Sequence, residues 1–220
     1  MTIDQTRPTR TNLRSAGMAH AELITGSLAK RTLEWVAALV GLVFLLPLML
    51  AVAAAIVLDS RGPVLYRQTR VGLNGSVFQI LKFRTMTQSA SQADFRQAER
   101  DDARVTRVGQ MLRRTNLDEL PQLLNVLAGD MALIGPRPHP PALDAVFMSA
   151  MPGFTARYSV RPGMTGWAQI HGHRGETRTF EQMQARVEHD LHYIENWSLL
   201  LDLQILAKTM FSFRAYKNAF

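Results

Sequence analysis

The chain has no cysteine among its 220 residues. This absence excludes disulfide bridges, thiolate metal sites and a cysteine nucleophile, and it leaves the cellular compartment open. Acidic residues are also in the minority, with 18 Asp and Glu against 25 Lys and Arg, which gives a formal net charge of +7. The basic excess indicates an anionic partner, and composition alone does not choose among lipid, nucleotide and nucleic acid.

A second absence is that of charge between Trp35 and Leu58. A continuous helix over this run would be about 36 Å long, enough to cross a hydrocarbon core of roughly 30 Å. Pro47 lies near its centre, where a proline removes one amide donor and clashes with the carbonyl four residues earlier, so we expect a kink. A signal peptide is disfavoured because the run is too long and starts too far from Met1.

Basic residues are balanced on the two sides of this run. Residues 1–34 and residues 59–84 each hold five Lys and Arg. Basic flanks prefer the cytoplasm, so a helix that enters the membrane and returns is favoured over a spanning helix, with a buried soluble helix third. We therefore expect a mobile basic tail over 1–29, a re-entrant membrane helix over 30–59 broken at Pro47, and a cytoplasmic domain over 60–220.

The rest of the chain predicts an α/β fold that is mainly helical. Residues 60–84 contain two β-type runs around the turn sequence "GLNG", which predicts a hairpin with Lys82 and Arg84 on one face. A helix is expected from Phe180 to Trp197, with Asp190 beside an apolar stripe where it needs a partner if buried. The C-terminal residues 196–220 suit an amphipathic helix at a membrane interface.

Two segments between these elements leave alternatives open. Residues 141–158 carry an apolar set that either packs on the core or lies on the membrane surface. His171 and His173 have metal-ligating chemistry without an obvious third ligand, and exposed loop histidines are commoner.

Leucines recur at helical spacing from Leu117 to Leu127, and Pro121 suits the first turn of that helix. This pattern places Asp118 and Glu119 at the helix N-terminus, where acidic residues commonly act as caps. The nearby arginines, Arg113 before the pair and Arg137 after the helix, offer a second interpretation. Carboxylates and guanidinium groups together can form a phosphate site if a divalent cation, Mg²⁺, offsets the repulsion between carboxylate and phosphate.

Four stretches in a fixed order resemble the bacterial sugar transferases, also called monotopic phosphoglycosyl transferases. They are "KFRTM", "RRTNLDELPQLLNVLAGDMALIGPRP", "RPGMTGWAQIHGHRGET" and "VEHDLHYIENWSLLLDLQIL". The resemblance runs from about Lys30 to about Lys208. It implies a monotopic enzyme on the cytoplasmic face of the bacterial inner membrane, so that the domain over 60–220 would be catalytic.

The resemblance also implies the reaction and its participants. A sugar 1-phosphate would pass from a UDP-sugar to undecaprenyl phosphate, with Mg²⁺ as cofactor, inner-membrane lipid as surroundings and no nucleic acid. In the family the aspartate of the dyad is the nucleophile, here Asp118, and the glutamate helps to hold the metal, here Glu119. Other matching positions for substrate binding are Lys82, Arg113, Arg137 and Asp190, and Arg84 matches less closely.

Two details of the resemblance bear on topology and on the sugar. The family has a Ser-Pro pair at the break of its re-entrant helix, whereas this chain has Leu46 before Pro47, which removes one hydroxyl that could satisfy the freed carbonyl. "HRGET" is closest to members that transfer glucose or galactose 1-phosphate in exopolysaccharide synthesis. The competing interpretation is a membrane-tethered basic domain that binds a polyanion as a scaffold, and the sequence leaves a homo-oligomer open.

Overall fold

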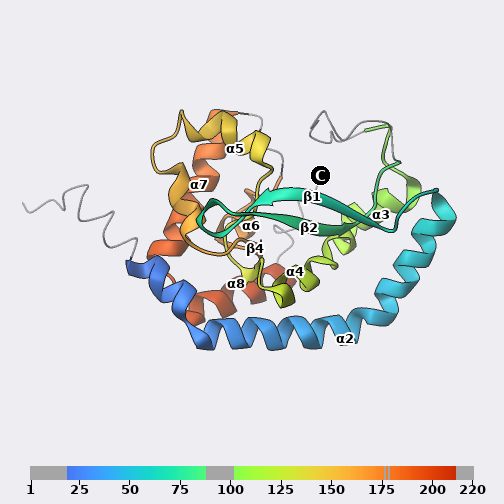
Figure 1. Ribbon diagram of the computed structural model, residues 1–220, viewed down its shortest axis with the longest axis horizontal. Helices are drawn as coiled ribbons and strands as arrows, with labels where there is room; N and C mark the ends of the chain where they lie inside the picture. Colours follow the sequence, from blue (N-terminus) through green and yellow to red (C-terminus); the bar gives the residue numbers. More distant parts are fainter. Residues whose placement is uncertain (1–18, 88–101, 176, 178, 212–220) are drawn as a thin grey trace, which may run out of the picture.

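The computed structural model describes residues 19–87, 102–175, 177 and 179–211. These residues form a mainly helical α/β fold with two small sheets, in agreement with the expected class (Figure 1). The helices are α2 (Leu28–Asp59), α3 (Arg107–Thr115), α4 (Gln122–Ala128), α5 (Pro141–Met148), α6 (Trp167–Ile170), α7 (Phe180–Glu195) and α8 (Leu199–Phe211). The strands are β1 (Leu65–Val71), β2 (Val77–Phe83), β3 (Ala132–Ile134) and β4 (Gly163–Thr165).

The longest element is α2. The Ser27 side chain caps its start by accepting a hydrogen bond from the backbone N of Lys30. The helix continues through Pro47 to Asp59, so it is bent where the sequence predicted a break. Figure 1 shows α2 along the base of the molecule before it turns upward toward its cyan end. A single proline removes one intrahelical donor and leaves the others in place, which bends a helix without ending it.

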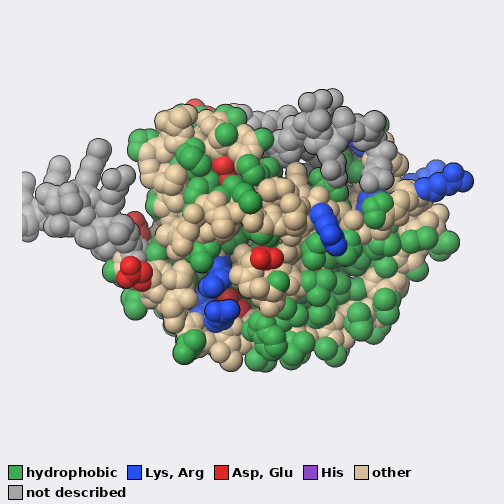
Figure 2. Space-filling model, viewed as in Figure 1, with side chains coloured by type: hydrophobic (Ala, Val, Ile, Leu, Met, Phe, Trp, Pro, Cys, Tyr) green, Lys and Arg blue, Asp and Glu red, His purple; other side chains and the backbone are tan. Residues whose placement is uncertain are grey.

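One side of α2 packs on the domain and the other is exposed. Ala38, before the proline, and Ile56, after it, are buried in clusters with the hairpin, α3 and α4. On the outer side, Phe44 is 82% exposed and Leu58 is 88% exposed. Figure 2 shows the apolar side chains gathered along this lower edge. In the described part of the chain, α2 is the helix long and apolar enough to cross a membrane.

The segment before α2 departs from the expected mobile tail over 1–29. Residues 19–26 are helical, and Ala21 and Ile24 are buried in a core cluster with Ile134 and Tyr193. The prediction was wrong here because two apolar residues three positions apart are enough to bury one face of a short helix, although the surrounding sequence is polar. Residues 1–18 lie outside the described residues.

A buried polar cluster joins α2 to the C-terminal helix. The Lys30 ammonium lies 2.7 Å from a carboxylate oxygen of Glu34 and 2.7 Å from one of Asp202 in α8. The Tyr193 hydroxyl donates a 2.7 Å hydrogen bond to Asp202. Lys30 is 5% exposed, so its charge is balanced by these carboxylates rather than by solvent. Elsewhere on α8, Leu200 and other apolar side chains are exposed, as expected of an interfacial helix.

The predicted hairpin is confirmed. Strands β1 and β2 pair antiparallel from Leu65 opposite Phe83 to Val71 opposite Val77. Asn125 of α4 docks the hairpin, because its side-chain oxygen accepts from the backbone N of Leu81 at 2.9 Å and its amide donates to the Gln79 carbonyl at 2.8 Å. The position of β2 relative to the residues that precede α4 is therefore fixed.

The short parallel pair of β3 and β4 carries the loop that follows Ile134. Ala132 pairs with Gly163 and Ile134 with Thr165. A Cβ on Gly163 would lie 2.1 Å from the backbone N of Gly135, so the two segments approach too closely for any side chain there. This contact fixes the start of the "GPRP" loop.

Most of the apolar set in residues 141–158 packs on the core, whereas Val146 and Met148 are exposed. Phe147, Met151 and Phe154 are buried in a cluster with Met183 and Val187 of α7. Figure 1 shows α5 and the upper part of α7 on the opposite side of the hairpin from α2. The α7 helix ends at Glu195, close to the predicted end at Trp197.

Candidate active site

Asp118 and Glu119 lie in a single 3₁₀ turn, Leu117–Glu119, between α3 and α4. The prediction had placed them at the N-terminus of a helix with Pro121 in its first turn. In the structure Pro121 is the N-cap of α4, and the pair precedes it. Asn116 ends α3 in the left-handed conformation, with φ 57°, and turns the chain sharply into the pair. No cap hydrogen bond from a side chain is present at the start of α4, so the capping interpretation does not account for the two carboxylates.

Three cations surround the Glu119 carboxylate. Its Oε1 accepts from the Lys82 ammonium of β2 at 2.8 Å and from Arg137 Nη2 at 2.5 Å. Its Oε2 accepts from Arg174 Nη2 at 2.8 Å. Both oxygens are therefore used, and the cations come from three separate parts of the chain: the hairpin, the "GPRP" loop and the loop before α7.

Asp118 has the opposite environment. It is buried, yet no hydrogen bond or ion pair to its carboxylate is present among the described residues. The positive charges of Lys82, Arg137 and Arg113 act on it from a distance. The cluster thus holds one carboxylate fixed by cations and a second one next to it that is open to another group.

The pKa values of the pair are pushed apart. Burial raises the pKa of Asp118, with the Lys82 charge as the main opposing influence. Burial would also raise the pKa of Glu119, but the charges of Arg137, Lys82 and Arg174 outweigh it and hold that pKa well below its usual range. Adjacent carboxylates in such different environments are a common feature of sites in which the two have separate roles.

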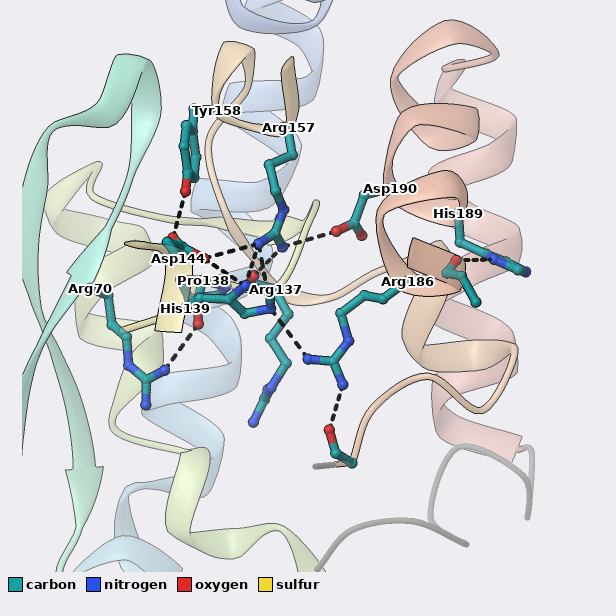
Figure 3. A network of polar contacts seen from close by, with 12 residues as sticks. Arg70, Arg137, Pro138, His139, Asp144, Arg157, Tyr158, Arg186, His189 and Asp190 are labelled. Carbon is teal, nitrogen blue, oxygen red and sulfur yellow. Dashed lines mark hydrogen bonds and ion pairs between the residues drawn. The ribbon is translucent and has the colours of Figure 1, made fainter. Parts of the chain in front are cut away.

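A buried polar network, shown in Figure 3, contacts the backbone of Arg137. Arg157 Nη2 donates to the Arg137 backbone carbonyl at 2.6 Å and contacts Asp190 Oδ2 at 2.9 Å. Asp190 therefore has the partner that its burial required, and burial raises its pKa. Its link to the carboxylate pair passes through Arg157 and Arg137.

Two predicted residues lie at the edge of the cluster or outside it. Arg113 is in the last turn of α3 and is half-buried, and its charge lowers the pKa of Asp118. Arg84 points elsewhere: its Nη2 donates to the Ser60 carbonyl at 2.6 Å and to the Ile56 carbonyl at 3.3 Å. It binds the last carbonyls of α2, a structural role for a basic residue at a helix C-terminus.

Sequence reasoning did not single out two residues of this region. Arg174 lies in "HRGET", a motif from which only the identity of the sugar was predicted and not a contact with Glu119. Arg157 lies in an irregular segment, and its function depends on contacts with two residues that are far away in sequence. No periodic pattern marks such a residue.

His171 and His173 are placed in a row of rings with Trp167 and His189. The ring centroids of His171 and Trp167 are 4.2 Å apart, and those of His173 and His189 are 4.5 Å apart. Within the described ranges, no group of three or more His, Cys, Asp or Glu residues could hold a metal ion by itself. The histidine pair therefore does not form a metal site with its neighbours.

The carboxylate pair fits one mode of magnesium binding. Mg²⁺ is usually held by one or two carboxylates together with substrate phosphates and water, and two adjacent carboxylates supply the protein's share. Asp118 has uncommitted oxygens, whereas the Glu119 oxygens are already bound to Lys82, Arg137 and Arg174. The donor set thus fits an ion that arrives with a phosphate-bearing substrate.

Comparison with known proteins identifies the family. The model of the family described as bacterial sugar transferase matches residues 25–215. The chain belongs to this family.

Among its relatives, a UDP-glucose:undecaprenyl-phosphate glucose-1-phosphate transferase of Caulobacter vibrioides is 51% identical over 88% of the chain and 72% of the relative. A protein of the same name from Escherichia coli is 45% identical over 88% of the chain, but the chain spans only 42% of its length. An exopolysaccharide production protein of Rhizobium leguminosarum is 43% identical over 83% of the chain and 94% of the relative.

Proposed function

We propose that the chain transfers a sugar 1-phosphate from a UDP-sugar to undecaprenyl phosphate through a phosphosugar-aspartyl intermediate on Asp118. The observation that carries this proposal is the contrast within the pair: Glu119 is bound by three cations, and Asp118 beside it is buried and free to attack. The relatives named as undecaprenyl-phosphate sugar phosphotransferases support the same reaction class.

The reaction has two displacements at one phosphorus. An Asp118 carboxylate oxygen bonds to the β-phosphorus of the donor, and the bond from that phosphorus to the bridging oxygen breaks, releasing UMP with the electron pair. An oxygen of the lipid phosphate then bonds to the same phosphorus, and the Asp118 carboxylate leaves. The product is a polyprenyl diphosphosugar, and no external oxidant or base is needed.

The surrounding cations provide electrostatic stabilisation of this transfer. Lys82 and Arg137 form ion pairs with Glu119, next to the proposed nucleophile. Their positive charges would stabilise the negative charge that spreads over the phosphoryl oxygens during transfer. Glu119 orients these two cations. To share the holding of Mg²⁺ with the substrate phosphates, it would have to exchange one of its contacts with Lys82, Arg137 or Arg174 for the ion. When bound, magnesium would neutralise phosphate charge that otherwise repels the attacking carboxylate.

We further propose that α2 is re-entrant and that the enzyme is monotopic, on the cytoplasmic face of the bacterial inner membrane. Ala38 and Ile56, on either side of Pro47, are both buried against the same domain. A spanning helix would carry its two ends to opposite faces of a roughly 30 Å hydrocarbon layer, which is incompatible with both halves packing on one domain. The exposed face with Phe44 and Leu58 would then contact lipid.

The transferred sugar is proposed to be a hexose, glucose or galactose, in exopolysaccharide or related glycoconjugate synthesis. The named relatives favour glucose, since the Caulobacter and Escherichia proteins are glucose-1-phosphate transferases. A relative from Aeromonas hydrophila, 44% identical, is named for N-acetylgalactosamine instead. A panel of UDP-sugars, with the lipid product identified by mass, decides among them.

The substitution Asp118→Asn tests the nucleophile. The expected result is loss of UMP release and of the covalent intermediate, detected by intact-protein mass, with the thermal unfolding temperature retained. Glu195→Gln, an exposed residue near the end of α7, is the matched control and should keep full turnover. Unchanged turnover in Asp118→Asn would reject the mechanism and favour the polyanion-binding scaffold.

A further inference from the structure

Two arginines flank Arg137 and are not used by the proposed transfer. Arg70 extends from β1 and Arg186 from α7, and Figure 3 shows them on either side of Arg137 with all three side chains extending in the same direction. Burial lowers the pKa of each, and the Arg137 charge acts on both and lowers it further. The three guanidinium groups therefore share one region of the protein.

Neither flanking arginine forms an ion pair with a carboxylate of the described residues, and both rely on neutral acceptors. Arg70 donates to the Pro138 carbonyl at 3.2 Å and to the Gln68 side-chain oxygen at 2.5 Å. Arg186 donates to the Gly175 carbonyl and contacts His139 Nε2 at 3.2 Å. The Nε atoms of both residues are buried without a hydrogen-bond partner.

This situation contrasts with the other buried cations of the region. Arg137 and Arg174 are balanced by Glu119, and Arg157 by Asp190. Burial lowers the pKa of Arg70 to about 10 and that of Arg186 to about 10, so both remain charged at neutral pH. The charge of Asp190 acts on Arg186, and those of Glu119 and Asp144 act on Arg70, without direct contact. A buried charge that no carboxylate contacts directly is costly, and part of this cost is recovered when an anion binds.

His139 is placed to accept a hydrogen bond from Arg186 through Nε2, because its Nδ1 lies 2.9 Å from a carboxylate oxygen of Asp144. Burial lowers its pKa well below the usual range, and the charges of Arg157, Arg186 and Arg70 lower it further. The neutral ring adds no charge and keeps Arg186 in place through Nε2. Arg186 is thus oriented before any ligand arrives, which reduces the entropy lost when it binds one.

We propose that Arg70 and Arg186 form a second phosphate subsite beside Arg137, separate from the phosphorus that Asp118 attacks. The inference rests on the proposed function, in which the participants carry two phosphate groups besides the one transferred: the phosphate that leaves with the nucleoside and the phosphate of the lipid. Planar guanidinium groups suit either of these phosphates, because each can donate two parallel hydrogen bonds to its oxygens.

The subsite is tested by binding, without turnover. UMP affinity is measured by isothermal titration calorimetry on the full chain in lipid nanodiscs, for wild type, Arg70→Gln and Arg186→Gln. Each glutamine variant should weaken UMP binding by about tenfold or more, the loss expected for one charged hydrogen bond. Arg67→Gln is the matched control, because Arg67 is exposed on the same strand as Arg70 and should leave the affinity unchanged.

The lipid phosphate is distinguished by steady-state kinetics on the same variants. If UMP affinity is unchanged while the KM for undecaprenyl phosphate rises about tenfold, the subsite holds the acceptor phosphate. If neither quantity changes in either variant, the subsite does not exist. Should the glutamine variants fail to fold, Arg70→Lys and Arg186→Lys keep the charge but lose the paired donors, and undiminished UMP and lipid-phosphate affinities in both would equally overturn the inference.

Failure of the proposed function is recognised separately. UMP release by wild type from a panel of UDP-sugars is measured first, and its absence rejects the transfer reaction itself. Normal wild-type release, with wild-type UMP and lipid-phosphate affinities in both variants, rejects only the subsite.

Discussion

Arg157 donates a 2.6 Å hydrogen bond to the backbone carbonyl of Arg137, and it is the residue that joins Asp190 to the carboxylate pair. Through this contact, a side chain that does not reach Glu119 sets the position of one that does. The importance of Asp190 for activity would then be indirect, because it fixes the orientation of Arg157.

The first prediction concerns this positioning role. Arg157→Lys keeps a positive charge for Asp190 but loses the planar guanidinium group, whose Nη2 bonds both Asp190 and the Arg137 carbonyl. The Arg137 guanidinium should therefore shift. We expect kcat to fall about 10- to 100-fold, as for other small displacements of a catalytic group, with a smaller change in KM. Arg107→Lys, an exposed change in α3, should match wild type. Equal losses in thermal stability and in activity, without a kcat effect in the folded fraction, would show a purely structural role.

The second prediction concerns pH. In the proposed mechanism Asp118 attacks as a carboxylate, and burial raises its pKa. On acidification, kcat/KM should therefore begin to fall at a higher pH than expected for an ordinary aspartate. The Lys82 charge opposes this rise. In Lys82→Met the acid limb should therefore move to still higher pH, besides the loss in rate. A pH–rate profile of both proteins checks the shift, and a limb that moves downward would contradict the assignment.

The third prediction concerns magnesium. Removing divalent ions with a chelator should abolish UMP release, and adding Mg²⁺ back should restore it, because the diphosphate charge otherwise repels the attacking Asp118 carboxylate. Thermal unfolding in the chelator should be nearly unchanged, since Glu119 remains bound by Lys82, Arg137 and Arg174. Full turnover after chelation would remove the metal from the mechanism.

The fourth prediction concerns topology. Thr11→Cys and Ser76→Cys place single thiols before α2 and in the exposed turn of the hairpin, in a chain with no cysteine of its own. Reagents confined to the periplasm should label neither in intact cells, and both should react after the membrane is opened. Labelling of one alone in intact cells would establish a spanning helix.

Much of the fold could be predicted from the sequence because it depends on local patterns. The turn "GLNG" between two β-type runs predicted the hairpin, the uncharged run from Trp35 to Leu58 predicted α2, and leucine spacing predicted α4. The short helix over 19–26 was missed because its apolar face is small and is buried only by contacts with distant residues.

Only part of the site could be predicted from the sequence, because its other contacts join residues that are distant in sequence. The motifs found Asp118, Glu119, Lys82 and Arg137, which the structure brings together. They could not show that Arg84 turns away toward the end of α2, because strand alternation stops informing side-chain direction once β2 ends at Phe83. The hydrogen bond from Arg157 to the Arg137 carbonyl likewise joins two segments that are distant in sequence, so no local pattern predicts it.

The buried pair of Lys30 and Asp202 ties the beginning of α2 to α8. The exposed apolar faces of α2 and α8 consequently belong to one rigid unit. The domain cannot rotate relative to α2 without separating two buried charges. On a bilayer, the height of Asp118 above the lipid would be set once, at folding. The long polyprenyl chain, and not the protein, would then have to supply the movement that brings the acceptor phosphate to the nucleophile.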